Sequence, residues 1–191
     1  EGVTFHDGTP FNAEAVARNI ERSQTLEESR RKSELASIES TEVTGDHEIK
    51  LILSGPDATL PAQLADRAGM MVSPDAADEA GADFGANPVC SGPFKFDERV
   101  AQDRIVLSKF ADYWNAEEIM LDSVTYLPIP DTTVRLANLQ SGDIHILDRL
   151  AATDLAQVEG SDSITVEPAT SLGYQGITIN VGNGENAENP F

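Results

Sequence analysis

The sequence predicts an α/β protein, and three observations lead to this fold class. Strand-like and helix-like segments alternate along most of the 191 residues. Capping residues mark where the expected helices begin, and glycines mark where several of them end. The chain is also long enough to bury a hydrophobic core in one or two domains. Alternation of strand and helix is typical of an α/β layer.

The first helix is expected directly after residue 12. Asn12 is a preferred N-cap, and Glu14 in the first turn suits the positive end of the helix dipole. Phe11 and Val16 are placed to form a hydrophobic staple across the helix start. Apolar residues then recur with a helical period. They are Ala13, Val16, Ala17 and Ile20.

Hairpin and helix signals continue through the first half of the chain. Residues 38–43 and 47–53 are apolar-rich segments around a Gly-Asp turn, which predicts two paired strands. Residues 70–72 are expected to form a short apolar strand. Ser73, followed by proline, predicts the start of a helix that Gly81 ends.

The later half predicts more strands than helices. Residues 93–96 and 104–110 are expected to form a hairpin, and Asp131 is expected to cap a helix that Gly142 closes. Further strands are expected at residues 124–129, 144–147, 164–166 and 173–181. This order of strands and helices is the main support for an α/β layer in this half.

Composition excludes several classes of function. Against 13 Lys and Arg stand 33 Asp and Glu, so the net charge is −20. Such a charge repels nucleic-acid phosphates and anionic membrane surfaces, and no nucleic-acid partner is expected. The longest apolar runs are only a few residues, whereas a membrane-spanning helix needs about 20.

No catalytic motif stands out. The chain has none of the phosphate-loop, dinucleotide, zinc-protease or nucleophile-elbow patterns, and no cofactor is expected. Asp143 and His145 share a face of an expected strand near Asp148, but two or three ligands without a fourth indicate a structural role more than a metal site. Cys90 beside Ser91 has no histidine near it in sequence, so a nucleophile is not indicated.

Four stretches, in order and spacing, share motifs with one family. Residues 2–16 read GVTFHDGTPFNAEAV, residues 87–96 read NPVCSGPFKF, residues 112–114 read DYW, and residues 129–144 read IPDTTVRLANLQSGDI. They resemble the GVxFHDGxPxxAeDV, NPVGTGPFKF, PDYW and IPDxxxRLxxLqsGeiD motifs of the family 5 extracellular solute-binding proteins. These are the peptide, dipeptide and nickel-type receptors of ATP-binding-cassette importers.

The sequence departs from these motifs at three places. Ala15 stands where Asp is usual, Cys90-Ser91 where Gly-Thr is usual, and His145 where Asp is common. Cys90 carries a Cβ that glycine lacks, so the backbone there must accommodate a side chain. None of the three departures removes a reactive group, since the family binds its solute.

The resemblance implies a lobe of a type II periplasmic-binding-protein-like fold. Family members are two to three times longer and have two lobes around a hinge. Residues 1–84 would form an α+β accessory subdomain of the first lobe, and residues 85–191 part of its core α/β layer. The second lobe would be absent from this chain.

The resemblance also implies a non-catalytic function. The protein would capture a solute, an oligopeptide or dipeptide above others, by lobe closure and deliver it to a membrane permease. Its place would be periplasmic or extracytoplasmic, with a membrane tether as an option for the full-length protein. Two alternatives stay open, a metal-dependent hydrolase using Asp143 and His145, and a surface interaction module outside transport. The exposed face toward the second lobe could instead form a homodimer.

Loops at strand ends are expected to face the solute cleft. Arg67 could meet a carboxylate, the two methionines could give adaptable apolar contact, and Tyr174 could stack on the solute. The candidate ligand-binding residues are Arg67, Met70, Met71, Cys90, Ser91, Gly92, Tyr174 and Gln175.

Overall fold

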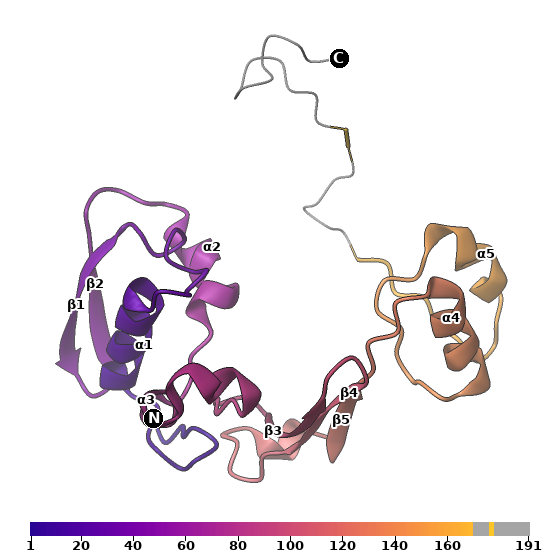
Figure 1. Cartoon of the computed structure of the whole chain (residues 1–191), viewed down its shortest axis with the longest axis horizontal. Coiled ribbons are helices and arrows are strands. Elements are labelled where there is room, and N and C mark those ends of the chain that lie inside the picture. Colours follow the sequence, from indigo (N-terminus) through magenta and orange to yellow (C-terminus); the bar gives the residue numbers. More distant parts are fainter. Residues whose placement is uncertain (170–175, 178–191) are drawn as a thin grey trace. The chain divides into compact units, whose positions relative to one another are not determined.

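The computed structural model describes residues 1–169 and 176–177. The chain divides into two compact units, Glu1–Pro128 and the segment that begins at Ile129. Figure 1 shows the elements of each unit. Residues 1–84 and the β-sheet that follows them share the first unit, and the expected subdomain boundary near residue 84 stays a prediction.

The first helix, α1 (Ala13–Thr25), begins where its cap predicts. The Asn12 side chain accepts a hydrogen bond from the Ala15 N–H at 2.9 Å. Ala13 and Ile20 are buried, as their spacing predicts, whereas Ala17 is only half-buried. The buried face is instead completed by Ala15 and by a polar residue, Asn19.

The predicted hairpin is confirmed as β1 (Ile38–Gly45) and β2 (Glu48–Leu53), which pair antiparallel. Helix α1 packs against this pair, as Figure 1 shows. A cluster of buried apolar side chains forms the core here, and partly buried Val16 and Leu51 add to its edge. Its members are Ile20, Leu35, Ile38, Leu60 and Ala68.

Two short turns of helix follow, α2 (Leu60–Leu64) and the 3₁₀ turn η1 (Arg67–Gly69). Gly69 lies so close to α2 that a Cβ there would stand 1.9 Å from the Leu64 carbonyl oxygen. Only glycine fits such an approach. The chain between the two turns is therefore held tightly against α2.

The expected strand at residues 70–72 is wrong. Met70 still belongs to the end of η1, and only Val72 pairs, in one isolated antiparallel bridge with Cys90. The reason is geometric, because helix α3 (Pro74–Ala80) starts two residues later and leaves no length for a ladder. Ser73 caps α3 and Gly81, at φ 54°, ends it, as the sequence predicts.

A 3₁₀ segment, η2 (Gly81–Ala86), leads into a three-stranded antiparallel sheet. Its strands are β3 (Phe94–Val100), β4 (Arg104–Lys109) and β5 (Ser123–Tyr126), in that order. The short 3₁₀ turn η3 (Ala116–Glu118) lies between the last two. The hairpin prediction is confirmed, and β5 stops short of residue 129 ahead of Pro128, which cannot donate to a ladder.

The second unit contains α4 (Thr132–Ser141), the 3₁₀ turn η4 (Ala152–Asp154) and α5 (Leu155–Val158). The Asp131 side chain accepts from the Val134 N–H at 2.9 Å, and Gly142 closes α4 in the left-handed region at φ 85°. Both helix boundaries match the sequence prediction.

The strands expected at residues 144–147 and 164–166 are wrong for the described part of the chain. Neither segment is a strand, and Ile146 is 85% exposed where burial was expected. A strand is held by hydrogen bonds to a neighbouring backbone, and no described segment pairs with these two. The strand expected at 173–181 lies almost wholly outside the described residues.

Candidate functional site

The structure brings together two of the predicted cleft segments, residues 67–71 and 90–92. Val72, directly after the first segment, forms the antiparallel bridge with Cys90. The Ser73 N–H also donates to the Val89 carbonyl at 2.9 Å. Met70 is 69% exposed at this junction, while Met71 and Cys90 are half-buried. These contacts join residues 67–73 to residues 89–92, and we call the two segments together the 72–90 junction.

Arg67 lies on η1 with its side chain exposed, and Ser91 and Gly92 are half-buried beside Cys90. Tyr174 and Gln175 lie outside the described residues. Six of the eight predicted residues therefore lie on the two segments that adjoin at the Val72–Cys90 bridge, and their contact with a solute stays a prediction.

Asn19 fixes one side of the 72–90 junction. Its side-chain amide donates to the Val72 carbonyl at 2.8 Å, and its Oδ1 accepts from the Val72 N–H at 2.9 Å. The same amide also donates to the Ala15 carbonyl at 2.8 Å. Asn19 is only 6% exposed, and Val72 is half-buried, so these bonds are largely shielded from bulk water. The amide satisfies Val72 as a neighbouring strand would.

Sequence reasoning missed Asn19. The available signal was its position, four residues after Ala15 and next to Ile20, on the face of α1 that had to be buried. A buried asparagine must find hydrogen-bond partners, and in a helix interior those partners are often distant backbone groups.

His6 fixes the other side of the junction. Its main-chain N–H donates to the Cys90 carbonyl at 2.8 Å, and its Nε2 lies 2.9 Å from the Gly92 carbonyl oxygen. The Cys90 N–H in turn donates to His6 Nδ1 at 3.4 Å. From the sequence alone His6 is simply a turn residue, because its partners lie 84 and 86 positions away.

Asp7 links the same turn to the start of α3. Its Oδ1 accepts from the Thr9 N–H at 2.9 Å and from the Thr9 hydroxyl at 2.6 Å. Its Oδ2 accepts from the hydroxyl of Ser73, which is fully buried and itself caps α3 by accepting from the Ala76 N–H. Burial raises the pKa of Asp7, but the hydrogen bonds from Ser73 and Thr9 outweigh it and lower that pKa overall.

Phe110 supports the junction from the three-stranded sheet. Its ring meets the His6 imidazole edge-on at 4.9 Å, and it is 6% exposed. Its N–H donates to the Pro93 carbonyl at 2.8 Å, which holds the chain directly after Gly92. The neighbouring pair Tyr113 and Trp114 is tilted at 5.5 Å, and Trp114 is 64% exposed.

The groups at the junction do not form an activated nucleophile. Burial raises the pKa of the Cys90 thiol, so the thiolate needed for nucleophilic attack is disfavoured at neutral pH. The imidazole of His6 is occupied by backbone partners and does not activate that thiol. Cys90 is also absent from the residues with positive φ, so its side chain replaces glycine without backbone strain.

The residues of the hydrolase alternative do not form a site. Asp143 accepts from the Ser141 hydroxyl at 2.7 Å, and His145 is exposed. Among residues 1–169 and 176–177, no group of three or more His, Cys, Asp or Glu is arranged to hold a metal ion. Within the same residues, no helix has both the length and the apolar character that crossing a membrane requires.

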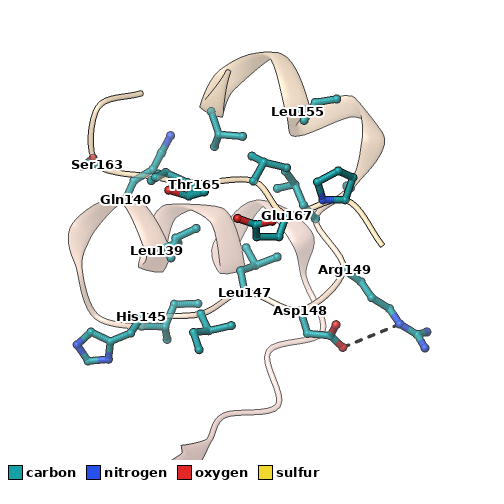
Figure 2. A pocket seen from close by; sticks show the side chains of 18 of the residues that line it. Leu139, Gln140, His145, Leu147, Asp148, Arg149, Leu155, Ser163, Thr165 and Glu167 are labelled. Carbon is teal, nitrogen blue, oxygen red and sulfur yellow. Dashed lines mark ion pairs between the residues drawn. The ribbon is translucent and has the colours of Figure 1, made fainter. Parts of the chain in front are cut away.

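A separate hollow of about 1000 Å³ lies in the second unit. Figure 2 shows the side chains of Leu139, Leu147 and Leu155 around it. At its rim the Arg149 guanidinium lies 3.9 Å from the Asp148 carboxylate, and both side chains are at least 90% exposed. None of the six predicted cleft residues that the structure describes lines this hollow.

Solved structures place this fold in a class. The chain superposes with a TM-score of 0.79 on AgaA from A. tumefaciens R10, bound to agropinic acid, at 30% identity over 85% of this chain and 33% of that one. It superposes with a TM-score of 0.72 on the oligopeptide-binding protein AppA from Bacillus subtilis, bound to a nonapeptide, at 30% identity over 84% and 33%. The fold is therefore part of a type II periplasmic-binding-protein-like lobe, as the sequence predicts.

The chain belongs to the bacterial extracellular solute-binding proteins, family 5, whose sequence profile matches residues 1–191. It is 32% identical over 181 residues to the glutathione-binding protein GsiB of Pectobacterium atrosepticum, and 32% identical over 182 residues to GsiB of Escherichia coli K12. These matches cover 94% and 95% of this chain but only 35% and 36% of the relatives. The chain thus spans about a third of their length.

Proposed function

We propose that this chain is part of a receptor that captures a peptide-like solute without altering it and delivers it to the membrane permease of an ATP-binding-cassette importer. The observation that carries this proposal is family membership over the whole chain. Two relatives at or above 30% identity bind peptides, one a nonapeptide and one glutathione, which is itself a tripeptide. A peptidic solute is the ligand class these relatives share.

The 72–90 junction supports this proposal through its shape and chemistry. It offers exposed Met70 as an adaptable apolar contact and Arg67 as a partner for a carboxylate. Cys90 itself pairs with Val72 in an antiparallel bridge, and we expect main-chain groups at this place to take part in recognising a peptide. Such recognition tolerates different side chains, as a peptide importer requires.

A binding role without catalysis fits the groups described. The thiol of Cys90 is disfavoured as a nucleophile, and the Asp143 carboxylate is engaged by Ser141. We propose lobe closure as the mechanism, in which a solute that contacts both lobes favours the closed state by its differential affinity. The complete protein would act outside the cytoplasm, where a membrane tether would keep it near its permease.

Calorimetry of the full-length protein tests the proposal. Glutathione and peptides of two to nine residues would be titrated, and any ligand that co-purifies would be identified by mass spectrometry. We expect saturable binding at a stoichiometry of one, with every titrated peptide recovered intact. Cleavage of the peptide, or binding of none of them, would contradict the proposal. Residues 1–191 by themselves should bind much more weakly, because half of the cleft is missing.

The homodimer prediction for residues 1–191 has its own test. Light scattering of that segment should show a dimer if the face toward the second lobe pairs with itself. A monomer at all concentrations would remove this prediction and leave solute capture unaffected.

A further inference from the structure

The imidazole of His6 and the backbone of Cys90 and Gly92 form a closed set of contacts. The main chain of His6 donates to Cys90, and both ring nitrogens reach backbone groups of the same short segment. A turn near residue 6 is thus joined by three bonds to a segment more than 80 positions later. This is more than a single turn needs for its own stability.

The two ring partners define the tautomer of His6. The Cys90 N–H can only donate, so Nδ1 must be the bare nitrogen that accepts it. The Gly92 carbonyl can only accept, so Nε2 must carry the proton. The neutral ring therefore accepts a hydrogen bond from the Cys90 N–H and donates one to the Gly92 carbonyl.

Contacts with Phe110 also restrain the His6 ring. Phe110 packs edge-on against it at 4.9 Å, and the Phe110 N–H anchors Pro93, directly after the segment. On the opposite side, Cys90 is bridged to Val72, whose own N–H and carbonyl are both bound by Asn19. The Cys90–Gly92 segment is consequently fixed from two sides by side chains that are themselves restrained.

We propose that His6 is a positioning residue for solute capture, and that its neutral imidazole sets the backbone of Cys90–Gly92 for the peptide without touching the peptide itself. The inference rests on the proposed function and names one determinant of affinity within it. It accounts for a histidine at a turn where a residue with local partners alone would suffice. A segment that is already ordered lowers the ordering cost of binding, so loss of the two ring hydrogen bonds of His6 should weaken binding.

Three variants of the full-length protein separate the two ring contacts. His6→Phe keeps an aromatic ring against Phe110 but removes both ring hydrogen bonds. His6→Gln offers an amide that can still donate to Gly92, and His6→Asn offers an oxygen that can still accept from Cys90. Arg18→Met removes two ion pairs between α1 and α3 and leaves the His6 contacts in place, so it is the control for general loss of stability.

Binding of glutathione and of the tightest peptide would be measured by calorimetry for each variant. We expect His6→Phe to weaken affinity about tenfold and each amide variant to recover part of that loss. Arg18→Met should bind as the wild type does. Equal affinity for wild type and a folded His6→Phe would overturn the inference, and so would amide variants no better than His6→Phe.

Nitrogen-15 NMR gives a readout that does not depend on binding. The wild-type ring should show one bare and one protonated nitrogen, with the proton on Nε2. Amide exchange at residues 90–92 should accelerate in His6→Phe and stay unchanged in Arg18→Met. Unchanged exchange in His6→Phe refutes the positioning role even if the wild type binds peptide. A wild type that binds no peptide while these NMR results hold refutes the proposed function instead.

Discussion

Replacing Asn19 by leucine tests whether one buried amide holds the 72–90 junction. Leucine has the same branched arrangement of side-chain heavy atoms and suits a helix, so the change removes the hydrogen bonds while keeping the shape of the side chain. Val72 would lose the partners of both its N–H and its carbonyl, which Asn19 now binds at 2.9 and 2.8 Å. Each buried backbone group without a partner costs about 1–3 kcal/mol.

Val72 is half-buried, so water can replace part of the lost bonding. We therefore expect Asn19→Leu to lower the free energy of unfolding by about 2–4 kcal/mol, toward the lower part of the sum for two groups. Urea titration would measure this loss as a shift in midpoint at unchanged slope. Hydrogen exchange at the Val72 amide should accelerate in the same variant.

The matched control is Glu21→Leu, an exposed position on the same helix. It adds the same side chain without touching the junction, and its effect should stay within about 0.5 kcal/mol. If Asn19→Leu proves as stable as Glu21→Leu, the hydrogen bonds to Val72 contribute nothing and the reasoning about the junction fails.

Three further changes probe other contacts of the same unit. Gly69→Ala should destabilise the protein by about 1–3 kcal/mol in thermal unfolding, because its Cβ would meet the Leu64 carbonyl oxygen at 1.9 Å. Gly85→Ala, in open space, is the control and should be close to neutral. Equal melting temperatures of the two variants would contradict the close approach at Gly69. Asp7 has a pKa below its ordinary 3.8 in the folded protein. Its ionised form therefore stabilises the fold fully above pH 3.8, and this contribution is lost as the pH falls through the lowered pKa. The melting temperature of Asp7→Asn should accordingly lie below wild type at pH 7, and the gap should narrow as the pH falls below 3.8. A gap that does not narrow would show another cause. Arg18→Met removes two ion pairs, at 2.6 Å each, to aspartates on α3. Because these pairs are largely exposed, the free energy of unfolding should fall by at most about 1 kcal/mol, and the difference should vanish in high salt. A difference that salt leaves intact would indicate a packing contribution of Arg18 instead.

Helix boundaries were open to prediction because their signals are local. Asn12 and Asp131 each cap a helix through a backbone N–H three positions later, and Gly142 supplies the left-handed residue that ends α4. Contacts of this kind depend on neighbours in sequence, so residue type and spacing are sufficient to anticipate them.

Strands were harder to predict because their partners are distant. The 38–53 hairpin was predictable, since one short turn brings its two strands together. Residues 144–147 and 164–166 have the composition of strands, yet nothing in the described part of the chain pairs with them. Composition indicates what a segment can do in a sheet, and only a partner makes it a strand.

In the candidate site, too, local features could be predicted from the sequence and long-range contacts could not. Their place at the ends of expected strands pointed to residues 67–71 and 90–92, and the bridge pairs Val72, directly after the first segment, with Cys90 in the second. The side chains that hold them, His6 and Asn19, act across 53 to 86 positions. No periodicity or spacing rule reports contacts at that range, so these roles became visible only in three dimensions.

The bridge between Val72 and Cys90 also closes the base of an excursion that contains α3 and η2. Because its two ends are pinned to each other, lengthening the tip changes the closure entropy only slowly and need not displace the base. Residues 80–83, midway between the two ends of the excursion, are exposed. A fluorescent reporter attached there should leave the 72–90 junction undisturbed, which makes the excursion a suitable place for a label.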